Sequence, residues 1–178
     1  MTNASIFFMG MKHCGKTSLG SRLSWEMRMP FIDLDALIEK EYRPDSMLRC
    51  REISEQHGHE FFMELEATAA RRLTEKTDDE IAVVSLGGGT IENQKAMAFL
   101  HGNGVFIYLE EDVDTLYDRI MRKERPAFLS ADNPYEDFLS LYRRRTALYE
   151  KNADIVVSLK GKNLEEAYQT LLATLKEQ

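Results

Sequence analysis

Short apolar runs alternate with longer stretches in which apolar residues recur three or four positions apart. The first pattern is typical of buried strands and the second of amphipathic helices. Strands that alternate with helices predict an α/β fold, in which helices cover both faces of a parallel sheet. The expected strands are residues 6–9, 30–32, 81–86, 105–109 and 154–157, and the expected helices are residues 18–27, 36–41, 47–75, 93–100, 113–122, 135–149 and 164–175, with Asn163 as the N-cap of the last.

Length and composition favour one compact domain over residues 1–178, because no linker, repeat or low-complexity tract divides the chain. A net charge of -7 argues against non-specific nucleic-acid binding, which usually requires a basic face. Two cysteines cannot build a disulfide framework, and no apolar run is long enough for a membrane span or signal peptide. We therefore expect a cytoplasmic monomer that binds neither nucleic acid nor membranes.

The stretch Gly-Met-Lys-His-Cys-Gly-Lys-Thr at residues 10–17 fits the phosphate-binding loop pattern of P-loop proteins. It lies between a predicted strand and a predicted helix, which is the context that the motif requires. In that geometry the backbone N–H groups and the helix N-terminus bind a polyphosphate, Lys16 reaches its β- and γ-phosphates, and Thr17 coordinates Mg²⁺. The expected nucleotide-binding residues of this segment are Gly10, Met11, Lys12, His13, Cys14, Gly15, Lys16, Thr17 and Ser18.

Three side chains in or near that segment carry more specific expectations. A positive φ at His13 would cost on the order of 1 kcal/mol, which histidine tolerates better than most residues do. Cys14 is expected to fill the tight loop as a small side chain. Trp25 is expected to pack on the first helix and not to serve as a stacking platform for a ligand.

Two carboxylates, Asp33 and Asp35, follow the second predicted strand. In an extended Asp-x-Asp both side chains point the same way, so one can assist Mg²⁺ while the other accepts a hydroxyl proton. The alternative is that Asp35 caps the next helix and Asp33 is solvated. Three glycines, Gly87, Gly88 and Gly89, follow the third strand, where they either make a tight turn or let a ligand approach the backbone.

An arginine-rich region follows the fourth strand, and within it residues 123–134 show no periodic pattern. We interpret this segment as a mobile lid. Arg125 on such a lid could close over the transferring phosphoryl group and stabilise its charge, whereas the alternative is a solvated cation on an exposed loop.

These motifs, in this order, resemble those of the shikimate kinase family, small P-loop kinases that phosphorylate the 3-hydroxyl of shikimate with MgATP. The resemblance covers residues 10–17, 31–35, 58–66, 85–89, 125–126 and 145–149. It implies a three-layer P-loop kinase fold with a five-stranded parallel sheet in the order 2-3-1-4-5.

The resemblance also implies roles for individual residues. Asp35 would contact the shikimate hydroxyls and act as the base, Asp33 and Thr17 would serve the metal, and Lys16 and Arg125 would act on the phosphates. The acceptor site would comprise Asp35, the three glycines from Gly87 to Gly89, of which Gly88 and Gly89 contribute backbone amides, and Arg145, which would bind the acceptor carboxylate. Arg119 and residues 160–163 would lie where the family holds adenine.

The segment from Gly58 to Glu66 departs from the family pattern Gly-Glu-x-x-Phe-Arg-x-x-Glu at two positions. Met63 stands where the family has an arginine that helps to clamp the carboxylate, and a thioether replaces neither its charge nor its donors. His59 stands in place of the neighbouring glutamate, and its protonated form could return part of the lost charge.

Three functions remain open on the sequence alone. The first is an ATP-dependent shikimate kinase, the second a related kinase for another hydroxy-acid, and the third a P-loop nucleotide-binding regulator without catalysis. A binding protein would have no need of Asp33, Asp35, Arg125 and Arg145 together, so the sequence favours an enzyme.

Overall fold

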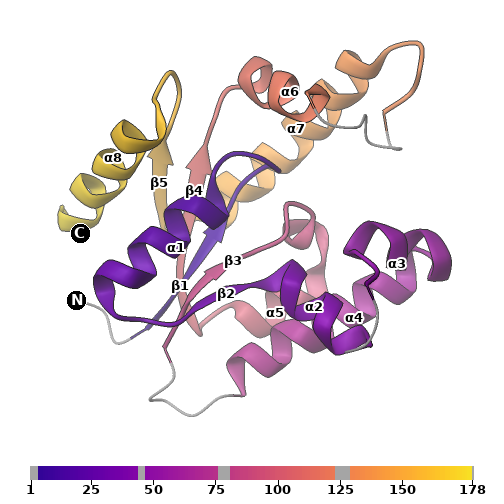
Figure 1. Cartoon of the computed structure of the whole chain (residues 1–178), viewed down its shortest axis with the longest axis horizontal. Helices are drawn as coiled ribbons and strands as arrows, with labels where there is room; N and C mark the ends of the chain where they lie inside the picture. Colours follow the sequence, from indigo (N-terminus) through magenta and orange to yellow (C-terminus); the bar gives the residue numbers. More distant parts are fainter. Residues whose placement is uncertain (1–3, 44–46, 76–80, 123–128, 178) are drawn as a thin grey trace.

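The structure is a computed structural model that describes residues 4–43, 47–75, 81–122 and 129–177. Five parallel strands form one sheet in the order β2-β3-β1-β4-β5, which confirms the predicted topology (Figure 1). The strands are β1 (Ser5–Met9), β2 (Phe31–Asp33), β3 (Val83–Ser85), β4 (Gly104–Glu110) and β5 (Ile155–Ser158). The helices are α1 (Lys16–Met27), α2 (Leu34–Tyr42), α3 (Cys50–His57), α4 (His59–Thr74), η1 (Thr90–Glu92, a 3₁₀ turn), α5 (Gln94–Leu100), α6 (Val113–Met121), α7 (Pro134–Asn152) and α8 (Leu164–Lys176).

The centre of the sheet is apolar on both faces, as a parallel sheet between two helix layers requires. β1 pairs with β3 and β4, and its Phe7 and Phe8 are almost fully buried. Helices α1 and α8 contact each other on one face, while α7 packs against β4 from the other (Figure 1). Because the strands are parallel, the P-loop, the start of α2 and the glycine loop, which follow β1, β2 and β3, lie at one edge of the sheet.

Most predicted elements agree with the structure to within a few residues, and two differences have clear physical causes. Helix α1 begins at Lys16, two residues early, because Gly15 adopts φ 107° and turns the chain into the helix directly. The helical stretch 47–75 is divided at Gly58, whose φ of 88° suits glycine and separates α3 from α4. The expectation that Trp25 packs on α1 was wrong, since 84% of its surface is exposed.

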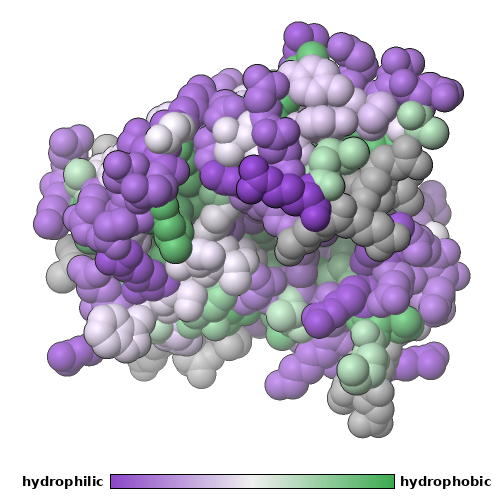
Figure 2. Space-filling view, turned by 45° about the horizontal axis from the view of Figure 1, so that its top comes forward, coloured by the Kyte–Doolittle hydropathy of each residue, from purple (hydrophilic) through white to green (hydrophobic). Residues whose placement is uncertain are grey.

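Hydrophilic side chains predominate on the face drawn in Figure 2. Within the described residues, none of the helices combines the length and the apolar character that a membrane crossing demands.

The predicted N-cap Asn163 is confirmed and forms a capping box at the start of α8. Its side chain accepts hydrogen bonds from the backbone N–H groups of Glu165 and Glu166, and the Glu166 side chain accepts one from the Asn163 N–H. These contacts satisfy donors that a helix N-terminus otherwise leaves without partners.

Replacing Asn163 by alanine should lower the free energy of unfolding by about 1 kcal/mol, because the helix loses its cap. Urea denaturation followed by circular dichroism measures the change. Gln169→Ala, on the exposed face of the same helix, is the matched control and should alter stability by less than about 0.5 kcal/mol. Equal effects of the two substitutions would show that the cap contributes nothing specific.

Candidate active site

The glycine loop after β3 lies at the centre of the candidate site. A Cβ atom on Gly87 would come within 2.6 Å of Asp35 Oδ1, and one on Gly88 would lie 3.2 Å from the backbone N of Lys12. A Cβ on Gly89 would lie 3.3 Å from Arg145 Nη2. Three consecutive residues without side chains thus let the second aspartate, the P-loop and Arg145 approach the same stretch of backbone.

The P-loop lies between β1 and α1, as its sequence predicts. Cys14 N donates to Met11 O at 3.2 Å, and the Cys14 side chain is only 2% exposed, which confirms its expected packing. Lys16 is buried, and its Nζ donates to the carbonyls of Gly10 at 2.8 Å and Met11 at 3.0 Å. His13 has φ 67°, as expected for the strained position of the loop.

Gly10 explains why this loop tolerates no side chain at its first position. Its φ is 146°, and a Cβ there would lie 2.8 Å from both the Cys14 sulfur and the carbonyl oxygen of Leu109. The start of the loop therefore packs tightly against the end of β4. This contact fixes the position of the backbone N–H groups that are expected to bind phosphate.

The two predicted metal ligands meet in the structure. Thr17 Oγ1 donates to Asp33 Oδ2 at 3.0 Å, which joins the first turn of α1 to the end of β2. A hydroxyl and a carboxylate are hard oxygen donors of the kind that Mg²⁺ prefers. The described residues contain no cluster of three or more His, Cys, Asp or Glu side chains suited to a metal ion, so this pair fits a Mg²⁺ that takes its other ligands from phosphates and water.

The Asp-x-Asp pair is not extended, which corrects the sequence interpretation. Asp33 ends β2 and caps α2 by accepting from Ala36 N at 3.3 Å, whereas Asp35 already lies in the first turn of the helix. The alternative, with Asp35 as the cap and Asp33 solvated, is wrong for the same reason. The helical turn separates the two carboxylates, so that Asp33 faces Thr17 and Asp35 faces Gly87.

Asp35 occupies an environment that disfavours its charge. Burial and the nearby carboxylate of Asp33 raise the pKa of Asp35 above its ordinary value, and the charge of Lys16 opposes them only in part. A carboxylate with a raised pKa is a stronger proton acceptor than an ordinary aspartate.

Arg119 of α6 contacts the P-loop at His13. Its Nη1 donates to the carbonyl of His13 at 3.1 Å, and its Nη2 pairs with the buried carboxylate of Glu111 at 3.0 Å. Burial raises the pKa of Glu111, while the charge of Arg119 partly offsets that effect. The predicted nucleotide-binding arginine is thus joined to the loop that would hold the phosphates.

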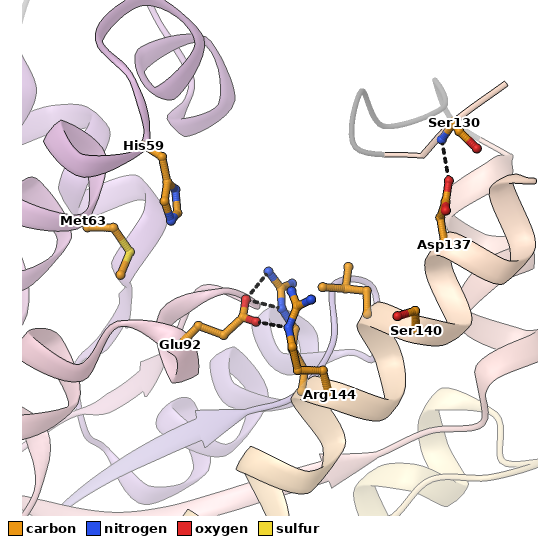
Figure 3. A pocket seen from close by; sticks show the side chains of 9 residues that line it. His59, Met63, Glu92, Ser130, Asp137, Ser140 and Arg144 are labelled. Atoms are coloured by element: carbon orange, nitrogen blue, oxygen red, sulfur yellow. Dashed lines mark hydrogen bonds and ion pairs between the residues drawn. The ribbon is translucent and has the colours of Figure 1, made fainter.

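Beyond the glycine loop the cleft contains two adjoining cavities, an inner one of 260 Å³ and an outer one of 760 Å³. Both are lined by His59 and Met63 of α4, by Glu92 of η1 and by Arg145 of α7. His59 and Met63 point into the space that Glu92 borders from the other side (Figure 3). The inner cavity also reaches Asp35 and the glycine loop, so the predicted acceptor residues share one cavity.

Glu66 is a site residue for which sequence reasoning assigned no role. It is 3% exposed, and its two carboxylate oxygens accept from Thr90 Oγ1 at 2.6 Å and Asn93 Nδ2 at 2.8 Å. Burial raises the pKa of Glu66, against the effect of these hydrogen bonds. The signal in the sequence was an ionisable residue on the apolar face of α4. The hydrogen bonds of Glu66 fix that helix to the segment after Gly89, at Thr90 and Asn93.

Tyr149 and Glu92 were also missed. The buried Tyr149 hydroxyl donates to Gly88 O at 2.6 Å and so fixes the glycine loop from α7. Glu92 accepts from Arg144 Nε at 2.7 Å and Arg145 Nε at 2.8 Å. Partial burial opposes ionisation of Glu92, but the hydrogen bond from Arg144 and the charge of Arg145 prevail and lower its pKa.

Arg125 and residues 123–128 of the predicted lid lie outside the described residues. The rest of that segment is anchored on α7. Leu129 is 2% exposed, and Ser130 N donates to Asp137 Oδ2 at 2.7 Å.

Comparison with known proteins agrees with this geometry. A sequence model of the family described as shikimate kinase matches residues 12–176. The chain belongs to the shikimate kinase family. Its members are ATP-dependent kinases, so the predictions of a P-loop kinase fold and of an enzyme are confirmed.

Individual members of the family show the extent of the likeness. A shikimate kinase from Thermus thermophilus is 34% identical over 170 residues, which are 94% of this chain and 86% of the relative. One from Haemophilus influenzae is 32% identical over 160 residues, covering 89% and 85%. The solved structure of shikimate kinase from Acinetobacter baumannii in complex with shikimate superposes with a TM-score of 0.82 at 25% identity, covering 98% of this chain and 92% of that one.

The environment of Asp35 predicts a pH-dependent stability difference. A carboxyl group whose pKa is raised on folding contributes stability that is present at low pH and lost as the pH rises through the raised pKa. Asp35→Asn removes this loss, so its free energy of unfolding should equal or exceed that of the wild type at neutral pH. Urea denaturation at several pH values measures the difference, which should shrink toward about pH 4 and below. A variant less stable than the wild type at neutral pH would contradict the assigned environment.

Proposed function

We propose that this protein transfers the γ-phosphoryl group of ATP to the 3-hydroxyl of shikimate. The observation that carries the proposal is the glycine loop, which lines one cavity together with Asp35 and Arg145 and packs against the P-loop at Gly88. That arrangement offers a base, a phosphate-binding loop and a carboxylate-binding cation to a single small molecule. The related Acinetobacter baumannii structure, which is a complex with shikimate, supports the same acceptor.

The nucleotide end relies on positioned charge, as phosphoryl transfer generally does. Backbone N–H groups of residues 10–17 and the N-terminus of α1 would bind the phosphates, with Lys16 adding a fixed positive charge. Thr17 and Asp33 would hold Mg²⁺, which neutralises phosphate charge when it is bound. Arg119, through its contact with the carbonyl of His13, keeps the far side of the loop in place.

Asp35 would act as the base at the acceptor end. It lies next to Gly87 in the inner cavity, and its raised pKa makes it able to take the hydroxyl proton as the phosphoryl group arrives. Asp35→Asn should therefore lower kcat far more than it weakens ATP binding, because an amide can hydrogen-bond a hydroxyl but cannot accept its proton.

Arg145 would bind the acceptor carboxylate beside the amides of Gly88 and Gly89, and His59 of α4 lines the same cavity. Arg125 is proposed from sequence to stabilise the transferring phosphoryl group.

Met63 favours a second candidate, a kinase of the same kind that acts on a different hydroxy-acid. It lines both cavities at the place where the family resemblance implies an arginine. A thioether makes no ionic contact with a carboxylate, so an acceptor that depends less on that group would lose less affinity here.

Release of ADP in a coupled assay tests the proposal directly. Wild-type protein with MgATP should turn over with shikimate, and more slowly or not at all with quinate or gluconate. Lys16→Ala is the control, because it should abolish turnover without altering the far-ultraviolet circular dichroism spectrum. No shikimate-dependent ADP release at millimolar concentration, with turnover of another acid, would establish the second candidate instead.

Replacing Met63 by arginine should lower the KM for shikimate by about tenfold or more, because a charged contact to the carboxylate is restored. Steady-state kinetics measure the change, and thermal unfolding shows whether the longer side chain is accommodated in the cleft. Met63→Leu keeps the apolar character and should leave KM nearly unchanged. An increase in KM for a folded Met63→Arg protein would mean that position 63 does not face the carboxylate.

A further inference from the structure

Glu92 forms an ion pair with Arg145, the arginine that the acceptor carboxylate would need. Its Oε2 lies 2.8 Å from both Nε and Nη2 of Arg145, and its Oε1 lies 2.7 Å from Nε of Arg144 (Figure 3). Each carboxylate oxygen is thus engaged by a different guanidinium group. A carboxylate from this chain already makes the contact expected of a carboxylate from the substrate.

The position of Glu92 is built into the fold. It ends the 3₁₀ turn η1, whose first residue Thr90 donates to the buried Glu66, and the next residue, Asn93, donates to Glu66 as well. These hydrogen bonds hold the turn in place, so Glu92 keeps a fixed position relative to α7. The guanidinium group of Arg145 packs against Gly89, where the absence of a Cβ atom leaves room for it.

The charged side chains that line the inner cavity show why the contact between Glu92 and Arg145 matters for binding an anionic acceptor. Among the described residues the lining carries the carboxyl groups of Asp35, Glu66 and Glu92 against the two arginines Arg51 and Arg145. Met63 adds no charge on the facing wall. Glu92 contacts the Nε and Nη2 atoms of Arg145, so an anionic acceptor can form a bidentate contact with this edge of the guanidinium group only if Glu92 gives up part of its own contact.

Arg144 offers Glu92 an alternative partner. The Arg144 side chain is 61% exposed, whereas those of Arg145 and Glu92 are 19% and 25% exposed. An exposed arginine can follow a displaced carboxylate at little conformational cost, while the more buried Arg145 stays at the cavity wall.

We propose that Glu92 is a specificity-determining residue that competes with the acceptor carboxylate for Arg145, while Arg144 retains Glu92 when an acceptor displaces it. This inference rests on the proposed function, since it takes Arg145 as the carboxylate-binding group. Glu92 thereby weakens the affinity for carboxylate-bearing acceptors and leaves the affinity for uncharged analogues unaffected.

Equilibrium binding separates this role from a structural one. Isothermal titration calorimetry in the presence of Mg²⁺ and ADP measures the Kd of shikimate and of its uncharged methyl ester. Glu92→Gln should bind shikimate about tenfold or more tightly than the wild type, because its amide competes weakly for Arg145, while the Kd of the ester changes by less than roughly twofold. Glu64→Gln makes the same change in net charge away from both cavities and should leave both Kd values unchanged.

A second variant gives a change of opposite sign. Arg144→Met removes the alternative partner of Glu92, so shikimate should bind several-fold more weakly than to the wild type. In the Glu92→Gln background the same substitution should have little effect. Thermal unfolding verifies that each variant is folded.

Three outcomes would overturn the proposal. They are an unchanged or weaker affinity of Glu92→Gln for shikimate, an equal gain for the methyl ester, and no binding of shikimate to either protein. The proposed function is judged separately by ADP release. Turnover of shikimate without the expected Kd pattern rejects the role of Glu92 alone, whereas the expected Kd pattern without turnover rejects the catalytic proposal alone.

Discussion

The candidate site depends on the close approach of other groups to the backbone at residues 87–89. A single methyl group at Gly87 would lie 2.6 Å from the Asp35 carboxylate, well inside contact distance. The same loop is fixed from α7 by Tyr149, which donates to Gly88 O. Because the glycines leave no side chain in the way, elements from three parts of the chain can surround one small molecule. The role of these glycines is steric, and their freedom to adopt a positive φ contributes nothing, since none of the three has one.

The fold and the nucleotide end could be predicted because their signals are local. Strand, loop and helix follow one another within residues 5–27, and the P-loop spacing fixes the geometry of its own backbone. The order of the sheet came from family resemblance, and it agrees with the structure. Local signals also misled, most consequentially at the Asp-x-Asp pair. Asp33 and Asp35 were expected to be extended, but Asp33 caps α2, so the helix starts between the two residues.

The acceptor end could not be predicted in the same way because its contacts join distant segments. Glu92 and Arg145 are 53 positions apart, and no periodicity or motif around either residue indicates the other. Glu66 had a partial signal, as a carboxyl group on an apolar helix face, but its partners Thr90 and Asn93 appear only when α4 packs beside η1. Such pairs follow from tertiary packing, and no local pattern in a single sequence indicates which distant residues will meet.

Two features of the acceptor end, the departure at Met63 and the contact of Glu92 with Arg145, act in one direction. Met63 removes a positive charge from one wall of the cavity, and Glu92 neutralises much of the charge that Arg145 provides on the other. Both features reduce the attraction for an anionic acceptor, while neither alters the contacts of Asp35, Lys16 and the glycine loop, the groups proposed to serve phosphoryl transfer. On the proposed function, the residues that tune the contact with the acceptor carboxylate are thus distinct from the groups proposed to transfer the phosphoryl group. Selection could alter acceptor affinity at positions 63 and 92 without disturbing the catalytic groups on which every acceptor depends.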